Sequence, residues 1–301
     1  MLADTRSADT RRAYEADLRD FFAFHTGETV TPASLASFCA LPSGPLALAL
    51  NGYKGHLQGR GLAESTVNRR LSAVRSLLRM ARRLGAMGAD PAGLVTGEKT
   101  WSYRDTRGPA LSEARRLLAA PDTSTLRGLR DRALLMLLCE NALRRGEIHK
   151  CDVGDFRPAE SRLLILGKGR GSQKEPVTLS PATVAAISVY LAARHSPSAD
   201  APLFCNLARF SDGGARLTGR GLLHVVNEYG RRVLGKDLHP HALRHMAITA
   251  CLDATGGDVR TAQRLSRHAD VRTLQRYDDN REDLQGKATQ LLSALLHGDG
   301  A

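Results

Sequence analysis

Apolar side chains recur every three or four residues along most of this chain, which is the spacing of amphipathic helices. In the N-terminal third the pattern predicts helices that begin near Thr10, Pro32, Leu46 and Ser65. Ser65 can cap the start of the last of these helices, and Gly85 can end it. Its buried stripe is the most regular and consists of Val67, Leu71, Val74, Leu78 and Ala81. The first part of the chain is therefore predicted to be an all-helical domain.

The opposite side of the same helix carries a row of arginines. Ion pairs within the helix do not explain this row, because almost no acidic residue lies between its members in the sequence. A solvated helix face is the ordinary explanation of such a pattern. We favour contacts with the phosphate backbone of a nucleic acid instead. The residues in question are Arg69, Arg75, Arg79, Arg82 and Arg83.

A linker follows this helix, because the helical periodicity lapses and glycine, proline and threonine accumulate. We predict a helical domain over residues 1–95, a linker over 96–108 and a larger domain over 109–301.

The larger domain mixes helical patterns with two short β-type runs, RLLIL at 162–166 and EPVTL at 175–179. The segment between them, GKGRGSQK, is rich in glycine and typical of a hairpin loop. Residues 153–156 are a candidate third strand, and an amphipathic tail helix is expected over 282–297. The sequence thus predicts a mainly α fold with one small antiparallel β-sheet.

The composition of the chain indicates a polyanionic binding partner. The 301 residues carry a formal net charge of +12, mostly from arginine, whose planar side chain makes paired hydrogen bonds to phosphate. Five scattered cysteines without a CxxC pair argue against disulfides and zinc knuckles and favour a reducing compartment. No apolar run approaches the ~18 residues of a membrane span, and no signal-peptide pattern opens the chain. We expect a cytoplasmic protein associated with the nucleoid.

The densest candidate chemistry lies in one stretch near the C-terminus. His241 and Arg244 stand three positions apart, so on one helix they share a face. A glycine pair at 256–257 then breaks the chain, and two further short helices are expected to bring His268 and Tyr277 back toward the first. Packed together, these side chains can hold a phosphate and attack it.

Other chemistries fit the residues less well. The hairpin GKG lacks both the GxxxxGK[ST] spacing of a P-loop and a following helix, which argues against an ATP site. The histidines of the C-terminal stretch could supply zinc ligands, but Arg244 would place a cation among them. An acidic run at 278–283 could bind magnesium, yet it is more typical of a solvated acidic face. We predict no metal and no cofactor.

The order and spacing of the motifs are more specific than any motif alone. ALRRGE at 142–147 is followed by a lysine in a β-hairpin and by HALRH at 241–245. RH at 267–268 then precedes a tyrosine by nine residues. Together these motifs resemble the tyrosine recombinase (phage integrase) family over essentially the whole chain, including a helical core-binding domain. Size and layout are most similar to the Xer-like, integron and phage integrases.

The resemblance implies a set of phosphate-binding residues. Arg144 matches the first arginine of the family, and Glu147 matches the acidic residue that braces it. His241 and Arg244 match the HxxR pair, and His268 matches the later histidine or tryptophan. Two arginines and a histidine can stabilise the charge that develops on a phosphodiester as it is attacked.

The resemblance also implies how the proton and the bond are transferred. Tyr277 matches the nucleophile, which forms a 3′-phosphotyrosyl link to DNA. A tyrosine hydroxyl has a pKa of about 10, so it needs a proton acceptor, for which His241 is the candidate. Lys168 matches the hairpin lysine and is expected to protonate the leaving 5′-oxygen, with Lys174 as the alternative in the same hairpin.

Two positions depart from the common pattern of the family. Ala142 stands where glycine is frequent before Leu-Arg, which is expected to be harmless. Arg267 stands where glycine is usual before the later histidine, and we expect it to alter local geometry or substrate contacts.

The resemblance finally implies a function and its partners. We expect a site-specific recombinase that binds double-stranded DNA as a tetramer and exchanges strands through a Holliday junction, in integration, excision or dimer resolution. The tail helix at 282–297 could dock on a neighbouring subunit or pack on its own domain. Two other functions stay open: a type IB topoisomerase-like nicking-closing enzyme with the same residues, and a DNA-binding accessory protein with a vestigial site.

Overall fold

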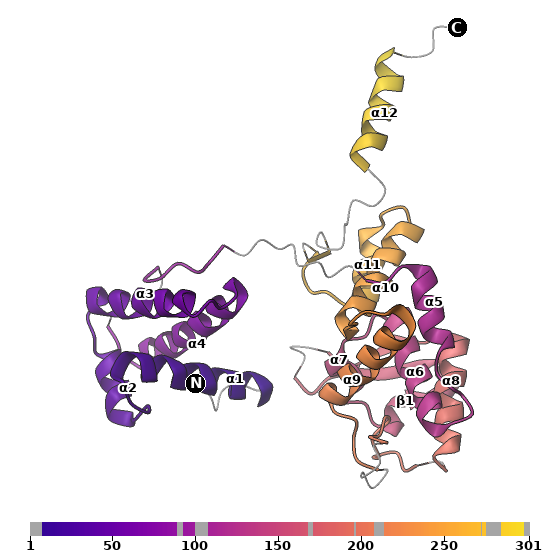
Figure 1. Ribbon diagram of the computed structural model, residues 1–301, viewed down its shortest axis with the longest axis horizontal. Coiled ribbons are helices and arrows are strands. Elements are labelled where there is room, and N and C mark those ends of the chain that lie inside the picture. The colour runs from indigo at the N-terminus through magenta and orange to yellow at the C-terminus, as the bar shows by residue number, and fades with distance from the viewer. Residues whose placement is uncertain are drawn as a thin grey trace. The chain divides into compact units, whose positions relative to one another are not determined.

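The chain divides into two units, Met1–Ser102 and Tyr103–Ala301 (Figure 1). Each unit has its own hydrophobic core. Most of the predicted linker lies outside the residues that the computed structural model describes. Those described residues are 8–88, 93–99, 108–167, 171–195, 197–207, 214–271, 273–274 and 284–297.

Helices make up the described part of the N-terminal unit, where the apolar periodicity predicts them. Thr31 starts the second helix with a capping box, in which its side chain and that of Ser34 each accept a backbone N–H. The fourth helix begins at Glu64, because the backbone leaves the extended region directly after Ala63. The predicted cap at Ser65 is therefore wrong. The helices are α1 (Ala8–Thr26), α2 (Pro32–Cys39), α3 (Ser43–Gly59) and α4 (Glu64–Arg83).

Aromatic rings hold the first three helices of this unit together. Phe21 of α1 meets Phe38 of α2 and Tyr53 of α3 edge-on, with 5.0 Å between the ring centroids in each pair. Val67 and Leu71 of α4 pack into the same core and are almost fully buried. The predicted apolar stripe is thus the buried side of α4, and the opposite side is left for its arginines.

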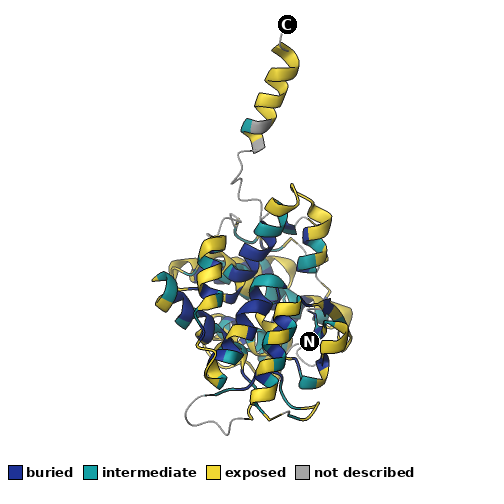
Figure 2. Cartoon of the chain, turned by 90° about the vertical axis from the view of Figure 1, so that its right-hand side faces the viewer, coloured by how far each residue is buried: buried dark blue, intermediate teal, exposed yellow. Residues whose placement is uncertain are grey.

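The larger unit is mainly helical, which confirms the predicted fold class. Helix α6 is buried along most of its length because it belongs to the main core of the unit, and such buried segments are dark blue in Figure 2. The helices are α5 (Leu111–Ala119), α6 (Leu126–Glu140), α7 (Arg145–Ile148), α8 (Pro181–Ala193), α9 (Gly219–Tyr229), α10 (Pro240–Ala254), α11 (Val259–Ser266) and α12 (Leu284–His297), with a π-helical turn at Gly230–Leu234.

A three-stranded antiparallel sheet completes the larger unit, in the order β1 (Phe156–Arg157), β2 (Arg162–Leu166), β3 (Lys174–Thr178). Leu163 of β2 lies opposite Val177 of β3, and both are buried in the main core. The candidate third strand at 153–156 is corrected, because 153–155 form a 3₁₀ turn and β1 begins only at Phe156. Residues 168–170 of the hairpin loop lie outside the described residues.

A buried ion pair ties α6 to α9. Arg130 Nε donates to Asp131 Oδ1 at 2.8 Å, and the hydroxyl of Tyr229 donates to Asp131 Oδ2 at 3.3 Å. The Arg130 Nη1 group also donates to the carbonyl oxygen of Cys205 at 3.0 Å. These bonds satisfy charged groups that burial would otherwise destabilise, and they fix the spacing of the two helices.

A second, smaller cluster joins the helices that carry the candidate residues. Ala142 from the turn after α6, Ile248 from α10 and Ala262 from α11 are buried against one another. Segments that are more than a hundred residues apart in the sequence therefore meet at one place.

The tail helix α12 exposes apolar side chains within the described part of the chain. Leu291, Leu292, Leu295 and Leu296 share one side of the helix by their spacing, and α12 is coloured mostly as exposed in Figure 2. The exposed fractions are 66% for Leu291, 58% for Leu292, 80% for Leu295 and 77% for Leu296.

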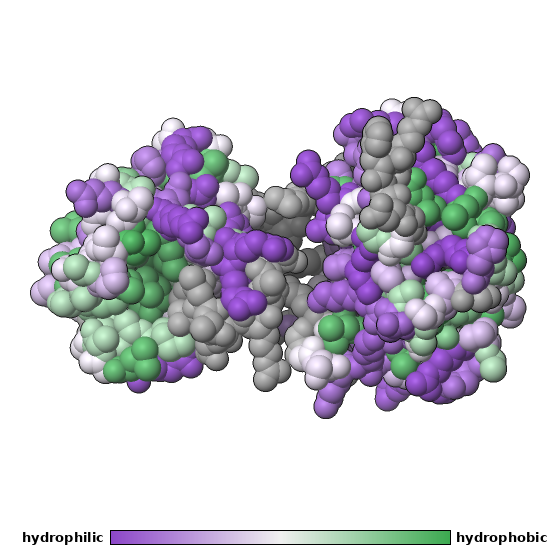
Figure 3. Space-filling model, turned by 90° about the horizontal axis from the view of Figure 1, so that it is seen from below, coloured by the Kyte–Doolittle hydropathy of each residue, from purple (hydrophilic) through white to green (hydrophobic). Residues whose placement is uncertain are grey.

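Elsewhere, hydrophilic residues cover much of the face shown in Figure 3, with smaller hydrophobic areas between them. Among the described residues no single helix is long and apolar enough to cross a membrane, and α2 with α3 meets that test only as a pair bent by 117°.

Candidate active site

Arg244 is the buried centre of the candidate site. It lies one turn after His241 on α10, and the residue is 1% exposed. Its guanidinium donates to the carbonyl oxygens of Ala142 and Ser266, and its Nη2 lies 3.1 Å from His268 Nε2. A buried guanidinium needs acceptors for its N–H groups. These contacts therefore fix the turn after α6 and the end of α11 around one side chain.

Arg144 reaches the site from the turn between α6 and α7. Its backbone N–H donates to Glu147 Oε2 at 2.8 Å, and its Nη1 donates to Glu147 Oε1 at 2.7 Å. The side chain of Arg144 is 30% exposed, whereas that of Glu147 is 2% exposed. One buried carboxylate thus holds both the backbone and the side chain of Arg144 and leaves part of the guanidinium accessible.

The turn before Arg144 is strained at Ala142, which has a left-handed backbone with φ 48°. A residue with a Cβ atom in this region costs roughly 1–2 kcal/mol. The carbonyl oxygen of Ala142 accepts hydrogen bonds from Arg244 and, at 3.3 Å, from Arg267 Nη2. These two arginines stabilise the turn in spite of its strain.

Arg267 belongs to the same network. It ends α11 with φ 56°, and its side chain turns back into the protein, where it is 11% exposed. Nη2 donates to Glu147 Oε2 at 3.1 Å, and Nη1 donates to the carbonyl oxygens of Leu265 at 2.7 Å and Asn141 at 3.3 Å. The sequence marks Arg267 only as a departure from a pattern. A charged residue at a position that favours glycine was the one available signal of its place in the site.

Burial and positive charge keep both histidines of the site neutral at neutral pH. Burial lowers the pKa of His241, and the charges of Arg244 and Arg144 lower it further. Burial, followed by the charges of Arg244, Arg144 and Arg267, lowers the pKa of His268 to about 4. A neutral imidazole has a lone pair with which it can accept a proton.

An opening of about 470 Å³ lies between α7, α9 and α10. Arg144, His241 and Arg244 line it, together with Arg145 and Leu223. Each formally charged residue of this lining is an arginine, so the opening favours an anion such as a phosphate.

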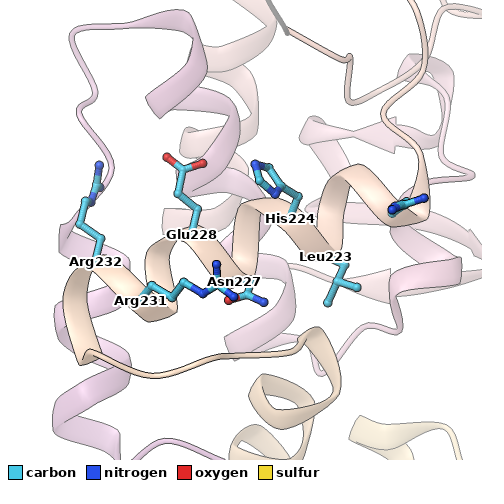
Figure 4. Close-up of a pocket in the computed structure, with 7 residues that line it drawn as sticks. Leu223, His224, Asn227, Glu228, Arg231 and Arg232 are labelled. Carbon is cyan, nitrogen blue, oxygen red and sulfur yellow. The ribbon is translucent and has the colours of Figure 1, made fainter.

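A second pocket follows the outer face of α9 and shares Leu223 with the first (Figure 4). Arg220, Arg231 and Arg232 make this pocket basic, while Glu228 forms an ion pair with Arg127. Sequence reasoning gave no role to this helix face, because its basic residues are spread over 220–232 without a motif.

Two of the candidate residues, Lys168 and Tyr277, lie outside the described residues. Lys174, the alternative to Lys168, donates from Nζ to both carboxylate oxygens of Asp155 at 2.6 Å and lies 3.6 Å from Asp152. Burial disfavours its charge, but the hydrogen bonds and charge of Asp155 prevail and raise the pKa of Lys174. A lysine held by two aspartates releases its proton less readily, which argues against Lys174 as a general acid.

The arginines of α4 fall into two groups. Arg69 forms an ion pair with Asp17 of α1, whose side chain is 4% exposed, and Arg75 donates to the carbonyl oxygen of Val95. No acidic residue lies between the members of this row within α4, but α1 supplies an acidic partner from another part of the unit, which the sequence pattern did not reveal. The remaining members of the row are exposed, namely Arg79, Arg82 and Arg83.

Within the described parts of the chain, no group of three or more His, Cys, Asp or Glu side chains is placed to hold a metal ion. The acidic run at 278–283 lies outside those parts. His268, one of the histidines considered for zinc, has the guanidinium of Arg244 at 3.1 Å, where it would repel a bound cation.

Comparison with known proteins connects this geometry to a family. The model of the phage integrase family matches residues 110–283. The chain is 45% identical to a tyrosine recombinase of Synechococcus elongatus, over 98% of this chain and 92% of that protein. It is 39% identical to a tyrosine recombinase of Synechocystis sp., over 98% and 94% of the two proteins. It is 33% identical to the tyrosine recombinase XerC of Pelobacter propionicus, over 90% and 84%.

Solved structures share the fold of both units. The XerH site-specific recombinase bound to a palindromic difH substrate, in a post-cleavage complex, matches with a TM-score of 0.67 and 19% identity over 93% of this chain and 79% of that one. A lambda integrase (75–356) dimer bound to a COC′ core site matches with a TM-score of 0.62 and 13% identity, over 91% and 90%.

The lowered pKa of His268 predicts how stability depends on pH. The ordinary pKa of histidine is about 6.5, so between that value and about 4 the unfolded chain binds a proton at this position and the folded chain does not. His268 therefore lowers the stability of the fold progressively as the pH falls through this window. We expect the difference in urea midpoint between the wild type and His268→Gln to shift in favour of the variant from pH 7.5 to pH 4.5. A difference that is constant with pH would contradict the neutral state of the half-buried His268.

Proposed function

This chain belongs to the phage integrase family and is a tyrosine site-specific recombinase that cleaves and rejoins DNA, and from that premise we propose that Tyr277 is its nucleophile and that cleavage leaves a 3′-phosphotyrosyl link. The observation that carries the proposal is the shared opening lined by Arg144, His241 and Arg244. Family membership favours this function over the topoisomerase and accessory functions that the residues alone left open.

The phosphate is held by charge in this proposal. Attack on a phosphodiester adds negative charge to its non-bridging oxygens, and fixed positive donors stabilise that charge without reorganising. Arg144 is partly exposed and braced by Glu147, so it can reach an incoming phosphate. Arg244 is buried, is held by two carbonyl oxygens, and forms part of the lining of the opening. His268 lies beside Arg244 and completes the set.

The proton and bond transfers involve the scissile phosphate and three side chains, those of His241, Tyr277 and Lys168. His241 accepts the proton of the Tyr277 hydroxyl, the new O–P bond forms, and the bond from phosphorus to the 5′-oxygen breaks. Lys168 gives its proton to that 5′-oxygen. The ester bond energy is kept in the link to the protein, so a 5′-hydroxyl from another strand can attack it and regenerate Tyr277.

Strand exchange between two sites requires more than one subunit. We expect a tetramer on double-stranded DNA that passes through a Holliday junction, with integration, excision or resolution as products according to how the two sites are arranged. A cytoplasmic location follows from this substrate. The homologous XerH and lambda integrase structures contain DNA sites, and the second of these is a dimer.

Replacement of Tyr277 by phenylalanine tests the nucleophile. On a nicked suicide substrate that loses the leaving strand, the wild type should accumulate a covalent complex resistant to SDS. Tyr277→Phe should form none, because it lacks the attacking oxygen, and its DNA affinity should stay within about threefold of the wild type. Tyr14→Phe, which removes a hydroxyl from α1, is the matched control and should react normally. Covalent product from Tyr277→Phe at the wild-type yield would refute the assignment.

A sulfur leaving group tests Lys168. Lys168→Ala should slow cleavage of ordinary DNA by on the order of 10²–10⁴, the usual contribution of a general acid. A substrate with sulfur in place of the scissile 5′-oxygen needs no proton on departure, so most of this loss should disappear. Lys174→Ala is the control in the same hairpin, and any loss it causes through the contacts of Lys174 to Asp155 should be equal on both substrates. Rescue of Lys174→Ala in place of Lys168→Ala would exchange the two roles.

The exposed arginines of α4 are proposed to contact the DNA backbone. Each phosphate contact contributes roughly 0.9 to the slope of log affinity against log salt concentration on duplex DNA. Replacing Arg79, Arg82 and Arg83 together by alanine should therefore reduce that slope by up to about 2–3. A charge-matched control replaces Arg11, Arg12 and Arg19 of α1, which are also exposed. Equal slopes for both triple variants would mean that only net charge matters.

The leucine side of α12 is proposed to dock on a neighbouring subunit. Exposed apolar surface of this kind marks an interaction site. Leu291→Ser with Leu295→Ser should leave cleavage of a single suicide site unchanged and strongly reduce the yield of products joined from two sites. Lys287→Ser with Gln290→Ser is a polar control on the same helix. Normal joining by the leucine variant, or a lowered thermal midpoint of the free protein, would contradict docking in trans.

A further inference from the structure

Two arginines, Arg144 and Arg267, contact the acidic residue of the site, Glu147. The carboxylate of Glu147 meets Arg144 Nη1 at its Oε1 and Arg267 Nη2 at its Oε2. All three side chains are at most partly exposed, at 30% for Arg144, 11% for Arg267 and 2% for Glu147. Glycine, which is usual at position 267 in the family, could supply none of these contacts.

Arg267 changes the net charge of the group that it forms with Arg144 and Glu147. Arg144 and Glu147 alone form a pair with no net charge, and in a buried place much of the attraction of Arg144 for an anion would be cancelled. With Arg267 added, the three groups carry a net charge of +1. The charge of Arg267 is also the foremost influence that keeps the pKa of Glu147 low against the effect of burial, ahead of the hydrogen bonds and charge of Arg144. Glu147 thus stays ionised as a brace, and its charge is offset by Arg267, which is not part of the lining of the opening.

Arg267 is connected to the second phosphate-binding arginine as well. Its Nη2 and the Nη1 of Arg244 donate to the same carbonyl oxygen, that of Ala142. Its Nη1 donates to the carbonyl of Asn141, the residue before. The turn from which Arg144 emerges is therefore held by Arg267 along two successive residues, in the strained conformation that aims Arg144 at the opening.

We propose that Arg267 is a positioning residue for DNA cleavage, which offsets the charge of Glu147 and holds the 141–142 turn so that Arg144 presents its positive charge to the scissile phosphate. This inference rests on the proposed function of Arg144. Arg267 itself is not among the described residues that line the opening.

The test measures the single-turnover rate of covalent complex formation on a nicked suicide DNA for four proteins: wild type, Arg267→Gly, Glu147→Gln and the double variant. Glycine adopts the left-handed conformation of position 267 without strain, so the fold should tolerate it. We expect Arg267→Gly to cleave 10- to 100-fold more slowly, with a dissociation constant for DNA within about threefold of the wild type. In the Glu147→Gln background no carboxylate charge remains to be offset, and only the bonds of Arg267 to the 141–142 turn are lost. The same substitution should therefore cost at least about threefold less there than in the wild-type background.

Two further variants separate charge from structure. Arg267→Lys keeps the charge near Glu147 and should restore most of the rate, whereas Arg267→Gln keeps a hydrogen-bond donor without the charge and should remain slow. The thermal midpoint of each variant is recorded. If Arg267→Gly is unstable, the cleavage rates of Arg267→Lys and Arg267→Gln are compared instead, and a faster rate for Arg267→Lys supports the inference.

The outcomes are distinct. If the wild type forms the covalent complex and Arg267→Gly forms it at the same rate, this inference is overturned. It is also overturned if Arg267→Gly loses the same factor in rate with and without the Glu147 charge, because a purely structural residue gives that result. If the wild type binds the nicked suicide DNA but forms no covalent complex with it, the proposed function is refuted instead.

Discussion

The described part of the site depends on one constraint, the need of the buried Arg244 guanidinium for acceptors. Its hydrogen bonds reach the turn after α6 and the end of α11, which α10 alone could not hold in place. Breaking such bonds would leave a charged group unsatisfied in the core, which is costly. The requirement therefore brings together segments that lie far apart in the sequence: the turn that precedes Arg144 and the residue His268 both lie against Arg244 of α10.

The concentration of positive charge that follows also sets the protonation of the site. Arginines keep their charge at any physiological pH, so the nearby histidines are the groups that lose their proton. His241 and His268 stay neutral and His241 can take the proton of a nucleophile. The same charge attracts the phosphate that the nucleophile attacks. One feature thus serves both the binding of the anion and the availability of the base.

Local patterns foretold much of this molecule. The apolar spacing located most of the helices, and the short β-type runs at 162–166 and 175–179 located β2 and β3, because both patterns are local properties of the chain. The order of the motifs identified the family, which the comparisons confirm. Contacts between distant segments stayed out of reach: Asp17 pairing with Arg69, Asp155 holding Lys174, and Arg267 turning back onto Glu147. The first helical residue of α4 was also missed, since a serine near a start does not dictate where the backbone turns.

The central claim is that fixed charge from arginine, above all from Arg144, stabilises the phosphate during attack. The most direct measurement compares the wild type and Arg144→Ala on two suicide substrates, one with the natural phosphodiester and one with an uncharged methylphosphonate at the scissile position. The account predicts that Arg144→Ala slows cleavage of the phosphodiester by on the order of 10²–10³ and that of the methylphosphonate by less than about tenfold. An equal loss on both substrates would contradict it, because Arg144 would then act through something other than its charge.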